Sequence, residues 1–167
     1  MSNKKTRFII YSAITAALVV ILTFIRIPLG EGAMVHLGSV AIVACALLFG
    51  APVAGLGAAV GSTVFDLISG MSPYTVWSFF IKGAMGLTIG YIAFIRNHGG
   101  KSVALNIFAS VCGGLVSLAG YIIAWAVVLG SIQAAIANIP FSLLTSAIGI
   151  IVGVPLAKIV SRSFKFH

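Results

Sequence analysis

Long apolar segments follow one another along almost the whole chain, and only short polar stretches separate them. Sixty per cent of the 167 residues are hydrophobic and 7% are charged, and the mean hydropathy is +1.20. A soluble domain would carry about a quarter charged residues. The sequence therefore predicts an integral membrane protein, whose apolar surface is shared between helix contacts and the lipid bilayer.

The predicted fold class is all-α: a polytopic bundle of six transmembrane helices that forms a single transmembrane domain over residues 1–167. A spanning helix needs about 17 to 25 apolar residues, so the second segment is the weakest of the six. The first segment also resembles a secretory signal, but its apolar part is too long and no convincing cleavage site follows. The predicted spans are 8–25, 35–49, 52–69, 74–95, 103–129 and 139–160.

Basic residues at the ends of the spans predict the orientation of the chain. Six spans place the three basic groups on one side, which the positive-inside tendency makes cytoplasmic. We therefore expect both termini inside a bacterial plasma membrane. Although the net charge is +8, this placement favours anionic lipid headgroups over a nucleic-acid partner. The three groups are Lys4, Lys5 and Arg7; Arg96 and Lys101; and Lys158, Arg162 and Lys165.

Two ionisable residues, Asp66 and Lys82, lie inside apolar segments. Such a group costs at least about 2.5 kcal/mol in lipid unless it faces a partner or a wet cavity. At 1.5 Å per residue, Asp66 lies roughly 6 Å and Lys82 roughly 12 Å from the outer ends of their helices. Lys82 shares a helix face with Gly86 and Gly90, so we expect its amine to point toward a neighbouring helix. An internal ion pair and an outward-opening polar cavity both fit this placement.

The first outward loop runs from Arg26 to His36 and mixes charged residues, glycine and apolar residues. It contains Glu31 between two glycines, Gly30 and Gly32, which give the backbone freedom. We expect the loop either to close over the outer mouth of the bundle as a lid or to serve as a simple connector.

The sequence offers no convincing catalytic constellation. The histidines are scattered over different loops and the C-terminus, the cysteines lie in separate apolar stretches, and Asp66 with Lys82 is the one candidate proton-transfer pair. We therefore expect no catalytic residues, no metal site, no bound cofactor and no enzymatic activity. Any uphill transport would take its energy from a partner or an ion gradient. A solitary channel, a scaffold and a small membrane enzyme remain alternatives.

Four short motifs resemble the substrate-binding S components of energy-coupling factor (ECF) vitamin transporters. The similarity extends over nearly the whole chain and is greatest to the riboflavin and the pyridoxine or hydroxymethylpyrimidine S components. It implies a subunit that captures a water-soluble vitamin at the outer side and docks on a transmembrane coupling subunit with two cytoplasmic ATPase subunits. The motifs are Asp66-x-x-x-Gly70, Pro73-Tyr74, Ile81-Lys82-Gly83-x-x-Gly86 and Ile139-Pro140-Phe141.

The resemblance also implies roles for particular residues. It places partner docking at Ala13 and Ala17 of the first helix and the vitamin site near the outer face. Related sequences often have asparagine where this chain has Ser142, and the smaller side chain favours a pyridine or pyrimidine over riboflavin. Asp66, Arg26, Glu31 and His36 are expected to support the site or form its lid. The implied substrate-binding residues are Tyr74, Trp77, Phe80, Lys82, Tyr121, Trp125, Gln133, Asn138 and Ser142.

Overall fold

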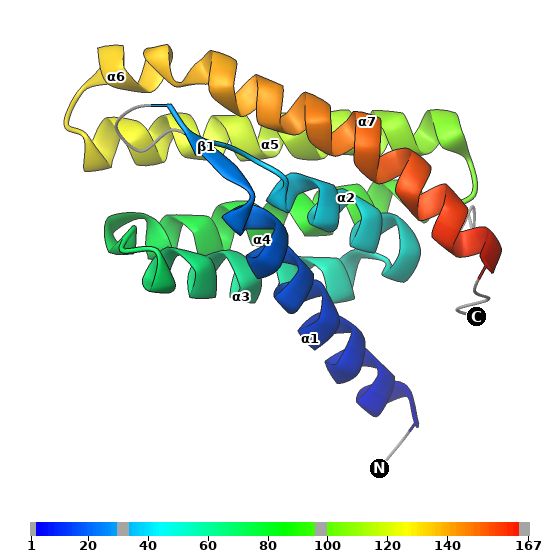
Figure 1. The fold of residues 1–167 in the computed structure, drawn as a ribbon. Helices are drawn as coiled ribbons and strands as arrows, with labels where there is room; N and C mark the ends of the chain where they lie inside the picture. The colour runs from blue at the N-terminus through cyan, green and yellow to red at the C-terminus, as the bar shows by residue number, and fades with distance from the viewer. Residues whose placement is uncertain (1–2, 30–33, 96–99, 164–167) are drawn as a thin grey trace.

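The computed structural model describes residues 3–29, 34–95 and 100–163, and most of these residues lie in helices (Figure 1). α2 lies in the middle of the bundle, with α3 and α4 on one side of it and α5 and α7 on the other. The elements in chain order are α1 (Asn3–Phe24), β1 (Arg26–Pro28), β2 (Met34–His36), α2 (Gly38–Phe49), α3 (Ala51–Ile68), the 3-10 helix η1 (Ser72–Tyr74), α4 (Thr75–Ala93), α5 (Val103–Val128), α6 (Ile132–Ala137) and α7 (Ile139–Ser163).

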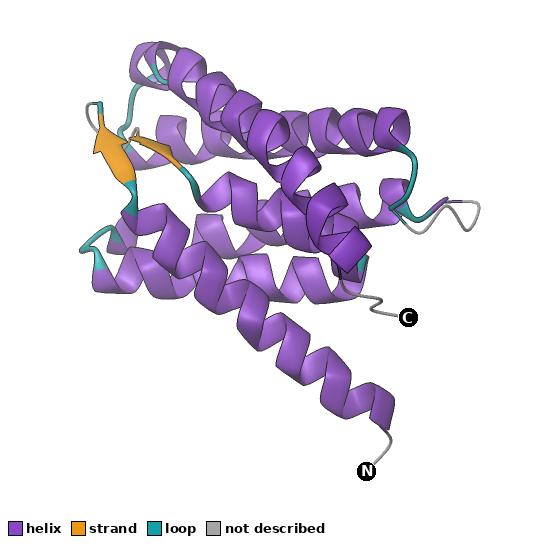
Figure 2. Cartoon of the chain, turned by 45° about the vertical axis from the view of Figure 1, so that its right-hand side comes forward, coloured by secondary structure: helices purple, strands orange, loops and turns teal. Residues whose placement is uncertain are grey.

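The predicted all-α class needs one correction at the first outward loop. Its two ends form an antiparallel pair of short strands in which Arg26 lies opposite His36. Figure 2 shows this hairpin at one end of the bundle, and both chain termini at the other end. Glu31, a predicted lid residue, lies outside the described residues. The predicted lid segment is therefore a hairpin whose two strands are described.

The second predicted span, 35–49, differs most from the structure. Its first residues belong to β2, and α2 has 12 residues, about 18 Å of helix against a hydrocarbon core of about 30 Å. Residues 38–47 are all buried, so neighbouring helices rather than lipid surround this segment. Short helices and strands are tolerated at membrane depth when protein covers them. Within the described residues, five other helical segments are long and apolar enough to cross a membrane.

Glycine pairs allow the helices to approach closely. A Cβ atom on Gly57 would lie 2.5 Å from Thr15 Cβ in α1, and one on Gly86 would lie 2.7 Å from the Ala54 carbonyl oxygen in α3. Such contacts exclude larger side chains and bring backbones together where lipid offers no hydrophobic drive. The three pairs at these internal contacts are Gly57/Gly61, Gly86/Gly90 and Gly149/Gly153.

The small residues Ala13 and Ala17, the predicted docking site on α1, do not pack inside the chain. The face of α1 that carries Ser12, Thr15 and Val19 is buried, whereas Ala13 and Ala17 are exposed. In Figures 1 and 2 the N-terminal half of α1 extends away from the other helices. Ala13 and Ala17 are therefore accessible to a partner from outside the bundle.

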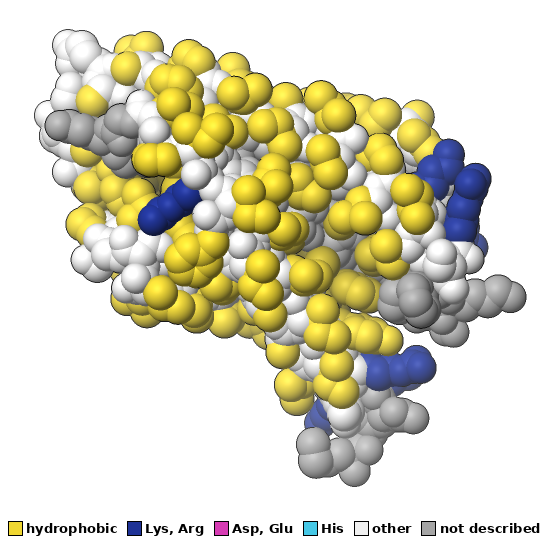
Figure 3. Space-filling model, in the orientation of Figure 1, with side chains coloured by type: hydrophobic (Ala, Val, Ile, Leu, Met, Phe, Trp, Pro, Cys, Tyr) yellow, Lys and Arg dark blue, Asp and Glu magenta, His cyan; other side chains and the backbone are white. Residues whose placement is uncertain are grey.

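The outer surface of the bundle is apolar. Figure 3 shows hydrophobic side chains over most of the visible face, and Ile21, Val127 and Ile151 are each at least 60% exposed. Dark-blue Lys and Arg side chains gather at the end where the termini lie. This distribution is typical of a protein that exposes its sides to lipid and its ends to water.

Candidate functional site

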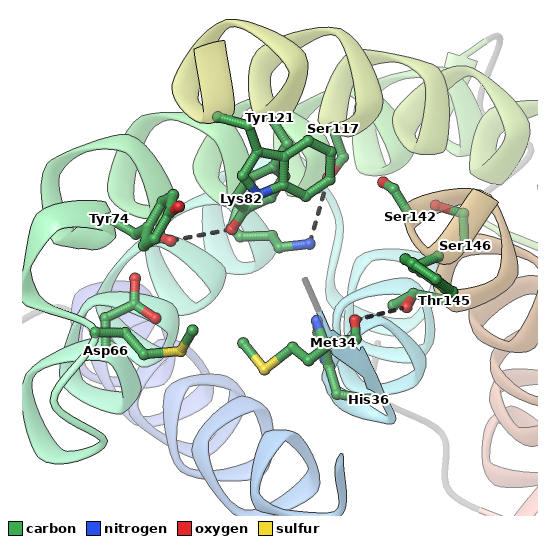
Figure 4. A pocket seen from close by; sticks show the side chains of 14 residues that line it. Met34, His36, Asp66, Tyr74, Lys82, Ser117, Tyr121, Ser142, Thr145 and Ser146 are labelled. Carbon is green, nitrogen blue, oxygen red and sulfur yellow. Dashed lines mark hydrogen bonds between the residues drawn. The ribbon is translucent and has the colours of Figure 1, made fainter. Parts of the chain in front are cut away.

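A cavity of about 50 Å³ lies at the hairpin end of the bundle (Figure 4). Four helices, η1, β2 and the loop between α3 and η1 contribute to its wall, so segments distant in the sequence meet there. The lining residues are Met34, His36, Asp66, Met71, Tyr74, Ser78, Lys82, Ser117, Tyr121, Trp125, Phe141, Ser142, Thr145 and Ser146.

Lys82 extends from α4 into this cavity and is only 6% exposed. Its Nζ donates a hydrogen bond of 3.3 Å to Ser117 Oγ of α5 and lies 4.9 Å from the centroid of the Tyr121 ring. A ring face and a hydroxyl both stabilise a desolvated cation. The prediction that the amine points toward a neighbouring helix is confirmed.

Asp66 lines the same cavity from α3 and is 4% exposed. Its Oδ2 has no hydrogen-bond partner among the described residues. In Figure 4 the Lys82 ammonium group points toward Ser117 and away from the Asp66 carboxyl group. A buried acceptor without a partner costs about 1–3 kcal/mol. The arrangement therefore favours a cavity wall with free hydrogen-bonding capacity over a closed internal ion pair.

Two hydroxyl groups link the walls that carry these charges. Ser78 Oγ of α4 and the Tyr121 hydroxyl of α5 are 3.0 Å apart and share a hydrogen bond. Ser78 also lies beside the Asp66 carboxyl group. The bond holds both hydroxyl groups in place on the side of the cavity where Asp66 lies, because neither can turn away without losing it.

His36, at the end of β2, adds a neutral donor. Its Nδ1 accepts a hydrogen bond of 3.1 Å from the Gly38 backbone N–H, so the neutral ring carries its proton on Nε2. Burial, and after it the positive charges of Lys82 and Arg26, lower the pKa of His36 from 6.5 to about 3. The imidazole is therefore uncharged at neutral pH.

We expect the folded protein to lose stability as the pH falls below about 6.5, the ordinary pKa of histidine. Between that pH and about 3, the pKa of folded His36, the unfolded chain binds a proton that the folded chain excludes. This difference lowers the free energy of unfolding by up to about 1.4 kcal/mol per pH unit. Thermal unfolding in detergent between pH 7.5 and 5 measures it. His36→Gln, which does not titrate, should show a flatter pH profile, and an equal slope in both proteins would contradict the assignment.

The hairpin is held against the bundle by contacts on both of its strands. Thr145 Oγ1 of α7 donates a hydrogen bond of 3.3 Å to the Met34 carbonyl oxygen of β2. Arg26 Nη1 of β1 lies 3.8 Å from Met34 Sδ and 3.6 Å from Met71 Sδ, and the guanidinium lies 4.9 Å from the centroid of the Phe65 ring. β2 thus forms one wall of the cavity. The lid role of Arg26, Glu31 and His36 stays a prediction.

The cavity brings together some of the predicted site residues. The spacing in the α4 region explains this selection, because Tyr74, Ser78 and Lys82 recur every four residues and share one helix face. The predicted residues that line the cavity are Tyr74, Lys82, Tyr121, Trp125 and Ser142, together with Asp66 and His36.

Four predicted substrate-binding residues lie elsewhere. Trp77 is partly exposed, and Phe80 is 67% exposed and packs edge-on against Phe79. Both are off the cavity-facing stripe of α4, since each residue turns a helix by about 100°. Gln133 is exposed and accepts a hydrogen bond from Ser131, while Asn138 is buried but does not line the cavity.

Seven lining residues were not predicted. Helical spacing could have found several of them, because Ser117 lies four residues before Tyr121 and Ser146 lies four after Ser142. The two methionines come from the hairpin and a turn, where no periodic signal exists. The missed residues are Met34, Met71, Ser78, Ser117, Phe141, Thr145 and Ser146.

Comparisons with known proteins identify the family. The model of a family described as the ECF-type riboflavin transporter S component matches residues 3–162. The chain belongs to this family. It is thus the S component of a vitamin transporter, a multi-pass membrane protein that binds a vitamin substrate. S components of this family work with ECF transmembrane and ATPase modules and are not enzymes.

Two proteins similar to this S component fit the assignment. A protein of Pyrococcus woesei described as an "Uncharacterized protein in gap 3'region" is 30% identical over 138 residues, 83% of this chain and 88% of the relative. The solved structure of ThiT from Listeria monocytogenes aligns with a TM-score of 0.61 and 19% identity, over 95% of this chain and 93% of the other. The second likeness shows a shared fold.

Within the described residues, no group of three His, Cys, Asp or Glu side chains could hold a metal ion.

Proposed function

We propose that this S component captures a single-ring vitamin, pyridoxine or hydroxymethylpyrimidine, for an ATP-driven importer. The observation that carries the proposal is the small cavity with a carboxylate, Asp66, and an ammonium group, Lys82, in its wall. Its volume of about 50 Å³ is far below the roughly 300–1,000 Å³ of pockets for drug-sized ligands. A small polar ring fits this site better than a three-ring flavin with a sugar-like chain.

Aromatic side chains supply the apolar surfaces that such a ring needs. Tyr121 and Trp125 lie with their ring centroids 5.5 Å apart at an angle of 31°. Trp125 is 5% exposed and packs in one buried cluster with Tyr74. Offset or edge-on packing of the vitamin against these rings adds about 0.5–1.5 kcal/mol per pair beyond the burial of area.

Riboflavin is the second candidate, and the family match favours it. Three fused rings need much more space than a single ring, and the cavity of about 50 Å³ is small even for one ring. Binding riboflavin would therefore require β2, with Met34 and His36, to move away from α7. That movement would break the hydrogen bond between Thr145 and the Met34 carbonyl oxygen.

The distribution of charge supports an orientation with both termini in the cytoplasm. Exposed basic residues lie near the N-terminus, between α4 and α5, and near the C-terminus. The hairpin lies at the opposite end (Figure 2) and its strand β2 lines the cavity, so the vitamin would enter from outside. The loaded S component would then reorient in the membrane while docked through Ala13 and Ala17 on a coupling subunit, and two ATPase subunits would supply the energy.

Binding measurements on the purified protein test the proposed substrate. Isothermal titration with pyridoxine, hydroxymethylpyrimidine and riboflavin compares the three ligands directly, and mass spectrometry identifies any compound that copurifies. The chain has two tryptophans, so a Trp77→Phe variant leaves Trp125 of the cavity as the fluorescent reporter. We expect one single-ring vitamin to bind at least tenfold more tightly than riboflavin. Tighter binding of riboflavin would establish the second candidate instead.

A further inference from the structure

The polar groups of the cavity are divided unevenly between its walls. Among the described lining residues, Asp66 is the one carboxylate, and its Oδ2 is buried without a hydrogen-bond partner. Lys82 and His36 present N–H donors from other parts of the wall, from α4 and β2. A ligand that satisfies both sides must donate a hydrogen bond at one edge and accept hydrogen bonds, best through a negative oxygen, at another.

We propose that the cavity selects a 3-hydroxypyridine ring in its zwitterionic form, with the ring N–H⁺ at Asp66 and the ring O⁻ at Lys82. This inference rests on the proposed function and chooses between its two single-ring candidates. The zwitterion forms when the phenolic proton leaves oxygen and a proton binds the ring nitrogen. The numbers of protons and electrons do not change, and the ring stays neutral overall.

The two charged walls explain why the zwitterion would be preferred to the uncharged tautomer. A charge-assisted hydrogen bond is roughly twice as strong as one between neutral groups. The uncharged tautomer places a bare ring nitrogen, an acceptor, against the Asp66 carboxylate, which is also an acceptor. At Lys82 it offers a neutral hydroxyl oxygen, which accepts a weaker hydrogen bond than O⁻ does. In a water-poor cavity these mismatches are poorly screened.

An aminopyrimidine satisfies the Lys82 wall less well. Its exocyclic amino group can donate to Asp66, but opposite Lys82 it offers only a neutral ring nitrogen, since the ring carries no hydroxyl that could become a negative oxygen. A hydroxypyridine also carries hydroxymethyl arms, for which the α7 hydroxyls of Ser142 and Ser146 provide both donors and acceptors. Figure 4 shows these two side chains on the wall across the cavity from Asp66.

Two ligand analogues separate the two edges. The 3-O-methyl ether of pyridoxine cannot form O⁻, whereas N-methylpyridoxine keeps the zwitterion but has no N–H donor. We expect each analogue to bind the wild-type protein about 10- to 100-fold more weakly than pyridoxine. In Lys82→Met the penalty of the O-methyl ether should disappear while that of the N-methyl analogue remains, and in Asp66→Asn the reverse should hold.

Absorption spectra give an independent readout, because the zwitterion of a 3-hydroxypyridine absorbs at longer wavelength than the uncharged tautomer. Pyridoxine bound to the wild-type protein should show the zwitterion spectrum, and pyridoxine bound to Lys82→Met should not. Penalties that neither variant changes, or the spectrum of the uncharged tautomer in the wild-type complex, would overturn the inference. Binding of hydroxymethylpyrimidine without pyridoxine overturns it too, but leaves the proposed single-ring function intact. Preference for riboflavin overturns both.

Discussion

The Lys82→Met variant is expected to bind the vitamin about 10- to 100-fold more weakly than the wild-type protein. The side chain is buried at the cavity wall, and among the described residues its ammonium group has one hydrogen bond, to Ser117, which leaves N–H donors for a ligand. Methionine keeps most of the length and apolar volume of lysine, so the change removes the charge without emptying the core. Isothermal titration of the purified protein measures the loss.

A second variant separates loss of binding from loss of folding. Removing one buried charge leaves the other without compensation, so Lys82→Met alone can lower stability. Combining it with Asp66→Asn removes both charges, and the double variant should unfold near the wild-type temperature yet still bind weakly. Lys101→Met, at the opposite end of the molecule, is the matched control and should bind normally. Wild-type affinity in Lys82→Met would refute the role assigned to this residue.

The Ala17→Trp variant is expected to do the opposite: uptake of the vitamin should fall at least about tenfold while binding by the isolated S component stays unchanged. Small residues let two helices approach closely, and a bulky side chain at the contact separates them. Ala17 is exposed on the face of α1 turned away from α3, so the tryptophan would meet nothing within the chain. The expected loss is in recovery of the complex with the coupling and ATPase subunits.

Cell uptake, copurification of the partner subunits and vitamin titration together test the docking surface. Ala13→Trp should behave as Ala17→Trp does. Ala104→Trp, at an exposed position near the start of α5, is the matched control and should leave uptake and assembly intact. Normal uptake and normal complex recovery with Ala17→Trp would show that the partner contacts another surface.

The long helices were the most predictable part of the fold. The predicted span 52–69 differs from α3 by one residue at each end, and the span 103–129 differs from α5 by one residue at its C-terminal end. Apolar composition and turn residues mark the ends of both helices. The second span was placed too early, since Val35 is as apolar as the helix that follows. In the structure it belongs to β2, where pairing with β1 decides its conformation. Such pairing depends on a distant segment, which local composition does not reveal.

The candidate site was only partly predictable. Asp66 and Lys82 stand out in the sequence because charge inside an apolar segment is costly. The sequence does not show how the two side chains are arranged, since the hydrogen bond from Lys82 goes to Ser117 on another helix. The expected contributions of Trp77 and Phe80 rested on the family resemblance, and neither residue lines the cavity.

By itself, the sequence determined that this protein lies in a membrane and that helices form most of it. It also identified two charged residues inside apolar segments as candidates for a functional site. These properties follow from local composition, because hydropathy summed over a single segment identifies a spanning helix and any charge within it. The tertiary structure decided that α2 is a short helix enclosed by its neighbours, and that β2 and four helices meet around one small cavity. Those properties depend on contacts between residues far apart in the chain, where glycine pairs and hairpin register set how closely the segments approach.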